Sequence, residues 1–532
     1  MKRGLIIFIL VLAAVVALAG LAAATAGRWL GPAMRAAVVE KLEKRFKSKV
    51  EVQELQISLF PSVVIIASDL RLHHRGRTDV PPLISMKKLT AHLSPWDLLR
   101  KPVRVGSVNL EGLKILIPPR RNKHDGNQTE DRRENTDGSD KRGKKVDPRE
   151  RYPYLVEKVH ADGTILMIIP KKADDEPLVW EIHRLRLRSV GMDRPMNFVA
   201  ELKNAKPPGP INSSGQFGPW QEDDPGQTFV AGAYTFKDAD LSVFNGIAGK
   251  LSSEGSYRGV LERIEVRGTT DTPAFKVTAA GNPVHLKTEF ASVVDGTSGD
   301  TLLDPVKASI GRSWLVARGG VTRIPGVAGK VVKLHVNVSE GHVEDMLRLA
   351  VKSRTPFLVG GIRFETEFLL PPGRQEIPVR LGLDGRFEIR SARFTTPGVR
   401  EKLKEFSWRA RGRPKDEQGN PDQVVSNFAG RFVLKNGVMT FSRLSFEIPG
   451  ARVALDGTYA LPNDQVDFYG DLRMQAKLSQ TVSGVKSVML KAVDPFFSKQ
   501  GAGTVLPIKI TGKQDNPQFG LNLGGRKAGR AR

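Results

Sequence analysis

The sequence predicts a mainly β protein, an elongated, repeated antiparallel sheet curled into an apolar groove, with an N-terminal transmembrane helix and a few short amphipathic helices. Two observations lead to this fold class. A charge-free run from Leu5 to Ala26 precedes a polar chain. From Val50 onward, apolar and polar residues alternate with a period of two, between turns rich in Gly, Pro, Asn and Asp. Such alternation is typical of strands in a sheet that has one face in water.

The N-terminal run is long enough to cross a bilayer. A membrane span needs about 20 apolar residues, whereas the apolar core of a cleaved signal peptide has about 7–15. The alternative is a cleaved signal peptide, because Ala24-Thr25-Ala26 before Gly27 has the A-x-A form of a cleavage site. We expect a retained anchor, and in both cases the rest of the chain is exported.

Composition excludes several classes of protein. The 532 residues include no cysteine, so disulfides, thiol nucleophiles and thiolate metal sites are absent. The net charge of +25 is spread over the whole chain, often as the polar residues of alternating strands, and aromatic residues make up only 7%. Nucleic-acid modules instead gather basic residues around stacking aromatics, so we expect no nucleic acid as a partner. A basic surface near anionic lipid headgroups fits the charge better.

Period-four spacing of Met34, Val38, Leu42 and Phe46 predicts a short amphipathic helix, which we expect to pack on the first sheet rather than bind the membrane. Strands follow up to residue 117, interrupted by one short helix that Ser94 caps and Pro95 begins. Four further helices are predicted at 238–244, 339–352, 396–406 and 480–493. Six segments result: an anchor 1–27, a β unit 28–117, a charged disordered insertion 118–151, β-repeat regions 152–370 and 371–523, and a basic tail 524–532.

The longest alternation runs from Val466 to Leu478 and predicts one thirteen-residue strand with an apolar even-numbered face. Similar alternation recurs in two earlier segments of the same region. Together they supply the candidate residues for an apolar groove: Val466, Phe468, Leu472, Met474, Ala476, Leu478, Leu381, Leu383, Phe387, Ile389, Phe428 and Phe432. Two sheets could cover this face as a sandwich, or the sheet could form an open trough that holds acyl chains.

Two repeats run along the chain. The pattern G-x-x-D-x-P-x-F occurs at Gly268–Phe275 and again at Gly512–Phe519, with apolar residues at matching flanking positions. It predicts a strand, a turn and a second strand in both places. A shorter pattern, glycine followed two residues later by an aromatic residue, occurs at 215, 232, 255, 385, 430 and 457. It indicates glycines that bend strands next to bulky side chains.

Enzymatic motifs are missing. No H-E-x-x-H, G-x-S-x-G, Walker or G-x-G-x-x-G pattern occurs, so we expect no catalytic residues, no metal and no cofactor. His73-His74 is expected to be a solvated strand end rather than a metal site, and Asp295 to Asp300 a turn rather than an ion site. Paired carboxylates cannot be singled out from sequence, which keeps an envelope hydrolase as a third hypothesis.

The anchor, the segment DLRLHHRGRTDVPPLISMKKLTAHLSPWDLLRKPVRVGSVNLEGLKILIPP and the C-terminal run FAGRFVLKNGVMTFSRLSFEIPGARVALDGTYAL through AKLSQ to LPIKITGKQDNPQF together resemble the AsmA-like family. The resemblance covers most of residues 1–115 and 380–523, and less distinctly 152–300. The resemblance implies a single inner-membrane span, a periplasmic body of repeated β-structure with an apolar groove, and phospholipids as partners. The expected function is non-enzymatic phospholipid transport or outer-membrane maintenance. The alternative is a periplasmic scaffold that assists outer-membrane protein assembly by binding partners, among them outer-membrane or periplasmic assembly proteins, through its strand edges.

Overall fold

A computed structural model places the chain in three dimensions. It describes residues 36, 39–40, 43, 48–58, 62–73, 81–99, 103–117, 154–168, 178–191, 195–219, 221, 224–278, 281–296, 298–324, 327, 329–373, 375–413, 426–481, 494, 503–513 and 516–522. The predicted anchor, the insertion 118–151 and the basic tail lie outside these residues. Within the described part of the chain, no helix has the length and apolar character required to span a bilayer.

The chain divides into two compact units. The first comprises Met1–Asp240, Ser252–Val266 and Asp295–Thr297, and the second Leu241–Leu251, Arg267–Val294 and Ser298–Arg532. The six segments drawn from the sequence stay predictions.

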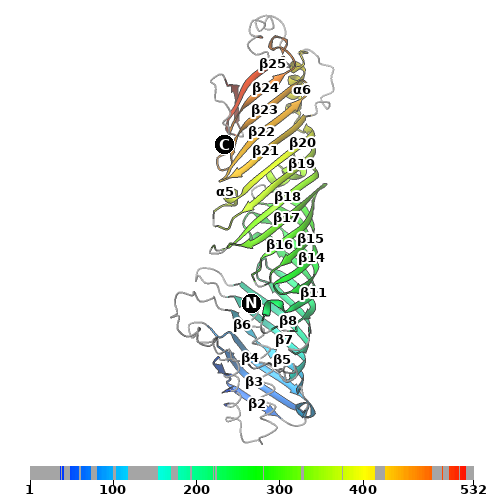
Figure 1. Cartoon of the computed structure of the whole chain (residues 1–532), viewed down its shortest axis with the longest axis vertical. Coiled ribbons are helices and arrows are strands. Elements are labelled where there is room, and N and C mark those ends of the chain that lie inside the picture. Colours follow the sequence, from blue (N-terminus) through cyan, green and yellow to red (C-terminus); the bar gives the residue numbers. More distant parts are fainter. Residues whose placement is uncertain are drawn as a thin grey trace, which may run out of the picture. The chain divides into compact units, whose positions relative to one another are not determined.

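Strands dominate the first unit (Figure 1). They are β1 (Val50–Glu51), β2 (Glu54–Ser58), β3 (Val63–Leu72), β4 (Ile84–Leu93), β5 (Val103–Glu111), β6 (Lys114–Ile117), β7 (Tyr154–Ile168), β8 (Leu178–Val190), β9 (Met196–Asn204), β10 (Gly209–Phe217) and β11 (Phe229–Asp240). The 3-10 helix η1 (Pro95–Leu99) confirms the short helix predicted after Ser94, and η2 (Pro225–Gln227) precedes β11. Two strands, β13 (Lys250–Val260) and β14 (Arg263–Val277), contribute residues to both units.

Consecutive strands of the first unit pair mostly antiparallel, as short turns require. The exceptions are β5 and β6, which both pair with β7 in parallel. Parallel pairing needs a long connection, and residues 118–153 separate β6 from β7 in the sequence. The long charged segment therefore falls where the topology demands a crossover.

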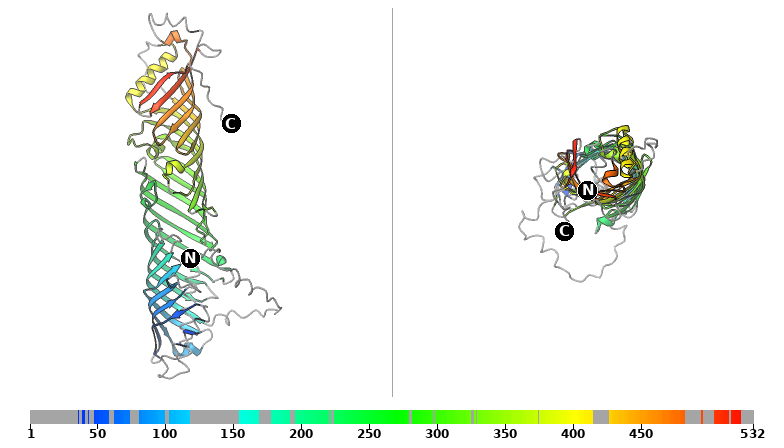
Figure 2. Two further views of the ribbon diagram at one scale, coloured as in Figure 1. Left: turned by 90° about the vertical axis from the view of Figure 1, so that its left-hand side faces the viewer. Right: turned by 90° about the horizontal axis from the view of Figure 1, so that it is seen from above.

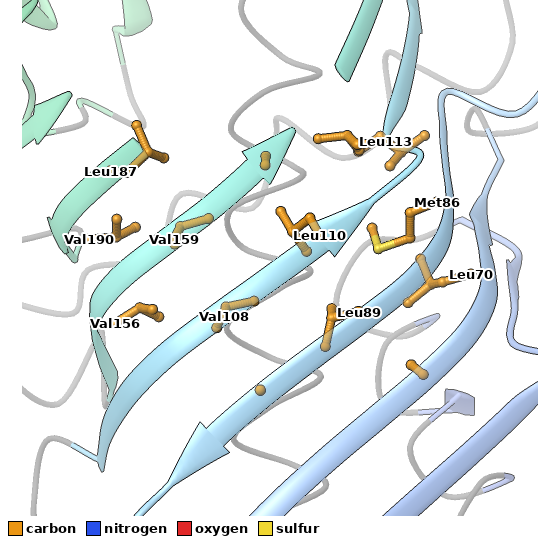
Figure 3. Close-up of a cluster of buried hydrophobic side chains, with 14 of the residues drawn as sticks. Leu70, Met86, Leu89, Val108, Leu110, Leu113, Val156, Val159, Leu187 and Val190 are labelled. Carbon is orange, nitrogen blue, oxygen red and sulfur yellow. The ribbon is translucent and has the colours of Figure 1, made fainter. Parts of the chain in front are cut away.

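One face of this sheet carries a fully enclosed apolar core (Figure 3). Ile65, Leu70, Leu89 and Leu113 each have 0% exposed surface. Val39 packs against this core, and Ala36, Val39, Glu40 and Glu43 are helical. Packing of this helical segment on the sheet is thus shown at Val39, whereas the predicted face of Met34, Val38, Leu42 and Phe46 lies outside the described residues.

The second unit is also built from strands (Figure 1). They are β12 (Ile247–Ala248), β15 (Val284–Val294), β16 (Thr301–Ile310), β17 (Ser313–Arg323), β18 (Lys330–His342), β19 (Leu358–Leu370), β20 (Gly382–Phe394), β21 (Ser426–Lys435), β22 (Val438–Ile448), β23 (Ala451–Ala460), β24 (Gln465–Met474), β25 (Thr504–Lys513) and β26 (Asn516–Leu521). Its helices are η3 (Leu241–Val243), α4 (Val343–Ala350), α5 (Ile377–Arg380), α6 (Pro397–Ala410) and η5 (Leu478–Thr481).

From β15 to β26, each strand pairs antiparallel with the next one in the sequence. The described strands therefore form one continuous series instead of two facing sheets. Every pair from β18 to β23 contains a register shift. Ser391 and Arg443 take positive φ angles, 53° and 54°, at two of these shifts. Bulges of this kind bend strands and increase their twist.

Several predicted element boundaries are wrong. The strand predicted over 466–478 ends at Met474, because the backbone turns through Gln475 to Lys477 into η5 and the Ala476 amide donates to the carbonyl of Ala410 in α6. Leu381 is the C-cap of α5 rather than a strand residue. The helix predicted over 238–244 is reduced to η3, since β11 continues to Asp240.

Three other predicted helices have different outcomes. Residues 339–342 extend β18, so only α4 is helical in the segment 339–352. Helix α6 runs four residues past the predicted end. Residues 480 and 481 belong to η5, and the rest of the helix predicted over 480–493 lies outside the described residues.

The long sequence repeat does not give two equivalent structures. The second copy forms the hairpin β25–β26, and Gly512 before the turn has φ 103°. The first copy lies within one uninterrupted strand, β14, so the turn predicted there is wrong. Thr269 and Thr270 occupy the positions of Lys513 and Gln514, and β-branched residues favour extended backbone.

Candidate functional site

The strand register places the large apolar side chains of the second unit on one face of its sheet. Phe364 lies opposite Phe387, and Leu472 lies opposite Leu506. Residues directly opposite in an antiparallel pair point to the same side. We call this side the apolar face. Its members include Leu334, Phe364, Phe368, Leu383, Phe387, Ile389, Phe428, Phe432, Leu434, Phe441, Phe446, Val453, Leu455, Val466, Phe468, Leu472, Leu506, Ile508 and Ile510.

Glycines in this face lie opposite aromatic rings of neighbouring strands. The pairs are Gly385–Phe432, Gly430–Phe387 and Gly457–Phe468. A Cβ atom at Gly385 would lie 2.7 Å from Cζ of Phe432, and one at Gly457 would lie 2.7 Å from Cδ1 of Phe468. No Cβ atom fits at such distances, so only glycine leaves room for the rings to lie across the neighbouring strand. The glycine–aromatic spacing in the sequence has this physical cause in β20 and β23.

The aromatic rings contact one another along the face. Phe364 and Phe432 stack with centroids 5.7 Å apart and planes 5° apart. The centroids of Phe428 and Phe446 are 4.7 Å apart. Ring pairs at these distances contribute about 0.5–1.5 kcal/mol beyond their buried area. The result is a cross-strand series of rings that stabilises the sheet and presents ring faces and edges on one side.

Two helices cover parts of the apolar face. Val343, Met346 and Leu347 of α4 pack against Ile362 and Ile389. Near the other end of the unit, Ala410 of α6 belongs to a buried cluster with Met474, and Phe406, Leu472 and Leu506 pack against this cluster. Figure 2 shows α6 as the yellow helix beside the orange and red strands.

Helix α4 is held in place by a buried carboxylate. Asp345 has 6% exposed surface and accepts hydrogen bonds from the backbone amide of Arg312, at 2.9 Å, and from the Ser313 hydroxyl, at 2.8 Å. Both donors lie at the turn between β16 and β17. A second carboxylate, Glu344, accepts a hydrogen bond from the Arg312 guanidinium at 2.6 Å. The cover that α4 provides is therefore fixed to the sheet by polar contacts as well as by packing.

Most apolar side chains away from the two helices are only partly buried. Leu383, Phe441, Val466 and Phe468 are all partly exposed. They contrast with the inward positions of β3, β4 and β5 in the first unit, most of which have almost no exposed surface. Aromatic and aliphatic side chains that remain accessible along several strands leave apolar surface in contact with solvent or with a ligand.

The opposite face of the same strands is charged. Arg386 forms an ion pair with Glu365 at 2.5 Å, and Arg431 one with Asp384 at 3.0 Å. These side chains are largely exposed, so each pair stabilises the sheet by about 0–1 kcal/mol. The pairs keep this face polar, and apolar ligands have one side of the sheet available.

The candidate groove residues have three different environments. Val466, Phe468, Leu472, Leu383, Phe387 and Phe428 are partly exposed members of the apolar face. Ile389, Phe432 and Met474 are buried, with 8%, 6% and 5% exposed surface. Leu381, Ala476 and Leu478 lie outside the strands, and Ala476 is buried at 4% beside the end of α6. The sheet thus brings nine of the twelve together.

Sequence reasoning missed several members of the face. Phe364 and Phe368 follow a clear alternation in β19 that could have identified them. Phe441 and Phe446 are harder, because the bulge at Arg443 breaks the period between them. The Arg443 amide donates to the Asp456 carboxylate at 2.8 Å, which stabilises the bulge. Only the register shows that both rings lie on the same side.

Polar clusters suggested by the sequence have ordinary partners. The His73 ring nitrogen Nε2 lies 3.3 Å from the Glu51 carboxylate, and His74 is outside the described residues. The Asp300 carboxylate accepts from the Arg323 amide at 3.1 Å and faces Lys330 at 3.5 Å. Within the described ranges, no group of three or more His, Cys, Asp or Glu side chains could hold a metal ion.

The fold and the face define a class: β-sheet proteins with one long apolar face, partly covered by short helices. The sequence model of the AsmA family matches residues 1–135. This match supports the resemblance to the AsmA-like family that the sequence predicted for residues 1–115. For residues 380–523, outside the matched range, the resemblance stays a prediction. Neither the curated proteins nor the solved structures include a match to the chain.

Proposed function

We propose that this chain is a non-enzymatic protein of the cell envelope whose apolar face binds the acyl chains of phospholipids, in support of phospholipid transport or outer-membrane maintenance. The observation that carries the proposal is the partly exposed apolar face of the second unit. It is formed by consecutive strands, it is rich in phenylalanine, and its reverse side is charged.

Such a face supplies what an acyl chain loses on leaving a bilayer. Each methylene exposed to water costs about 0.8 kcal/mol, so a chain cannot cross an aqueous space uncovered. An apolar surface that keeps the chain dry removes most of this cost without tight binding. The contacts are non-directional, which suits chains of varied length.

We infer that the face is concave. The register shifts from β18 to β23 support a strongly bent and twisted sheet. Among the described strands, the single series also leaves the face without a second sheet to cover it. A trough of this kind encloses a chain on three sides, whereas a flat sheet would leave it half in water.

The proposed location is the inner membrane, with one span from Leu5 to Ala26 and the body in the periplasm. The AsmA match includes this segment, and its length and lack of charge fit a span. Carbonate extraction followed by N-terminal sequencing tests it. A mature chain that begins at Gly27 would overturn the retained anchor.

Site-specific photocrosslinking tests lipid binding directly. A benzophenone amino acid replaces Phe468 on the apolar face or its neighbour Tyr469, which points to the other side of β24. Cells are labelled with radioactive phosphate, irradiated, and the full-length protein is purified under denaturing conditions. We expect labelled phospholipid on the Phe468 variant and background on the Tyr469 variant. Equal labelling of both would overturn the proposal.

A second candidate function, a scaffold that binds assembly partners through a strand edge, is favoured by β26. Among the described strands, β26 pairs only with β25. Phe519 and Leu521 on this strand are 74% and 45% exposed. An edge strand with exposed apolar side chains can accept a further strand. Protein crosslinks from position 519, together with absence of lipid crosslinks from position 468, would favour this function.

A further inference from the structure

In the first unit, the side of the sheet that carries the buried core also carries a cluster of hydroxyl groups. Along one cross-strand row, Leu185 of β8 lies opposite Ala200 of β9, Ala200 opposite Ser213 of β10, and Ser213 opposite Tyr234 of β11. Leu185 and Ala200 belong to the buried core. The row therefore changes from apolar to polar at β10 while it stays on the same side of the sheet.

Two residues of β13 complete this hydroxyl cluster. The Tyr257 hydroxyl lies 2.8 Å from Ser213 Oγ, and the Ser253 hydroxyl lies 3.1 Å from the Tyr234 hydroxyl. The Tyr234 and Tyr257 rings are 6.5 Å apart and tilted by 33°. All four side chains, Ser213, Tyr234, Ser253 and Tyr257, are partly exposed, so a ligand can reach them.

The proton arrangement makes Tyr257 a hydrogen-bond acceptor toward a ligand. Ser213 donates its single proton to the carbonyl of Ala233 at 2.9 Å, so in its contact with Tyr257 it accepts. The Tyr257 proton is thus committed to Ser213, and its oxygen keeps a lone pair. Burial raises the pKa of Tyr257, which keeps the phenol protonated.

Paired glycines give Tyr257 its position. Gly215 and Gly232 lie directly opposite each other on β10 and β11. A Cβ at Gly232 would lie 2.6 Å from the Tyr257 hydroxyl, so only glycine lets that hydroxyl cross β11 and reach Ser213. Tyr257 also packs against the buried pair Val230 and Leu261, which Phe217 and Ile264 contact as well. The phenol oxygen is therefore a polar point within an apolar surface.

We propose that this hydroxyl cluster binds a hydrogen-bond-donating lipid headgroup, a primary ammonium or a hydroxyl, while the neighbouring apolar residues contact the lipid's chain. The inference rests on the proposed function, because it assigns a headgroup preference to a protein that binds phospholipids. The cluster contains no cationic side chain, so a headgroup is distinguished by its donors and not by its phosphate.

The test compares headgroups on identical acyl chains. Delipidated full-length protein in detergent receives dioleoyl phosphatidylethanolamine, phosphatidylglycerol or phosphatidylcholine, and native mass spectrometry measures the bound fraction. Phosphatidylcholine has no donor on its headgroup. One hydrogen bond contributes about 1 kcal/mol, so we expect phosphatidylethanolamine to bind about fivefold more tightly than phosphatidylcholine. If phosphatidylglycerol binds as well as phosphatidylethanolamine or better, the cluster recognises any hydrogen-bond donor on the headgroup. If phosphatidylglycerol binds more weakly than phosphatidylethanolamine, the cluster recognises the primary ammonium.

Variants separate the hydroxyl from general lipid binding. We expect Tyr257→Phe to remove the preference for phosphatidylethanolamine over phosphatidylcholine while total lipid binding persists. Ser256 is exposed on the other side of β13, so Ser256→Ala should leave this preference unchanged. Equal binding of ethanolamine and choline by the unmodified protein overturns this inference but leaves the proposed function standing. Preference retained by Tyr257→Phe also overturns it. Failure to bind any of the three lipids overturns both.

Discussion

Replacement of Phe468 by aspartate separates an open apolar face from a closed core. Phe468 is partly exposed, lies opposite Gly457 and Ile510, and its ring centroid is 5.8 Å from that of Phe441. Full burial of a phenylalanine contributes about 1.5–3 kcal/mol, so a partly buried one contributes about 1 kcal/mol. The ring pair adds about 1 kcal/mol.

The expected loss of unfolding free energy for Phe468→Asp is therefore about 2 kcal/mol. Water reaches the position, so the new carboxylate stays hydrated and the larger penalty of a buried charge does not arise. For a unit of this size, the loss corresponds to a fall in Tm of about 4–8 °C. In a closed sandwich, an unpaired buried charge would cost about 3–5 kcal/mol more. That sum approaches the total stability of many proteins.

Lipid binding should respond more strongly than folding. A charge on the apolar face removes contacts with two or three methylenes, about 2 kcal/mol, which weakens binding about 30-fold. Circular dichroism and protease resistance report folding, and mass spectrometry reports co-purified phospholipid. Arg473→Asp, on the opposite side of β24 and exposed, is the control. An unfolded Phe468→Asp variant would indicate an ordinary core, and a folded one with normal phospholipid content would refute this position as a binding surface.

Three further predictions follow from the contacts. Gly457→Ala should lower stability by about 1–3 kcal/mol, measured as a urea midpoint, because its Cβ would lie 2.3 Å from the Asp467 carbonyl; Gly398→Ala in α6, where a Cβ meets nothing within 4 Å, should not. Asp345→Ala should cost about 2–4 kcal/mol, since it removes the acceptor for two hydrogen bonds that fix α4; an unchanged thermal melt would contradict this role. A hydrogen bond from Arg186 lowers the pKa of Asp162, so its contribution is present above pH 4 or so and is lost as pH falls below that. Both groups are partly exposed, so Asp162→Asn should reduce the difference in unfolding free energy between pH 6 and pH 3 by less than about 1 kcal/mol. Urea titrations at the two pH values measure this difference.

Period-two alternation was sufficient to predict the β class and the side on which most residues lie, because side chains of a strand alternate between its faces. Phe387, Phe428 and Leu472 could be assigned to the apolar face for this reason alone. The pattern could not predict the face at Phe446, since one bulge at Arg443 reverses the alternation. Bulges depend on the neighbouring strand and on contacts such as the one from Asp456, which local sequence does not reveal.

Exposure was decided by tertiary structure. The strands of the first and second units alternate alike, yet Ile65 and Leu89 are enclosed whereas Phe441 and Phe468 reach the surface. The glycine–aromatic spacing was visible in the sequence, but its meaning depends on the cross-strand partner, which places Phe468 over Gly457. The two G-x-x-D-x-P-x-F copies differ in the same way, as one forms a turn and the other continues as a strand. Sequence alone determined which residues can line an apolar surface, because that depends on side-chain chemistry and local period. Which of these residues remain uncovered depends on how elements distant along the chain pack together. Only the three-dimensional structure shows that packing.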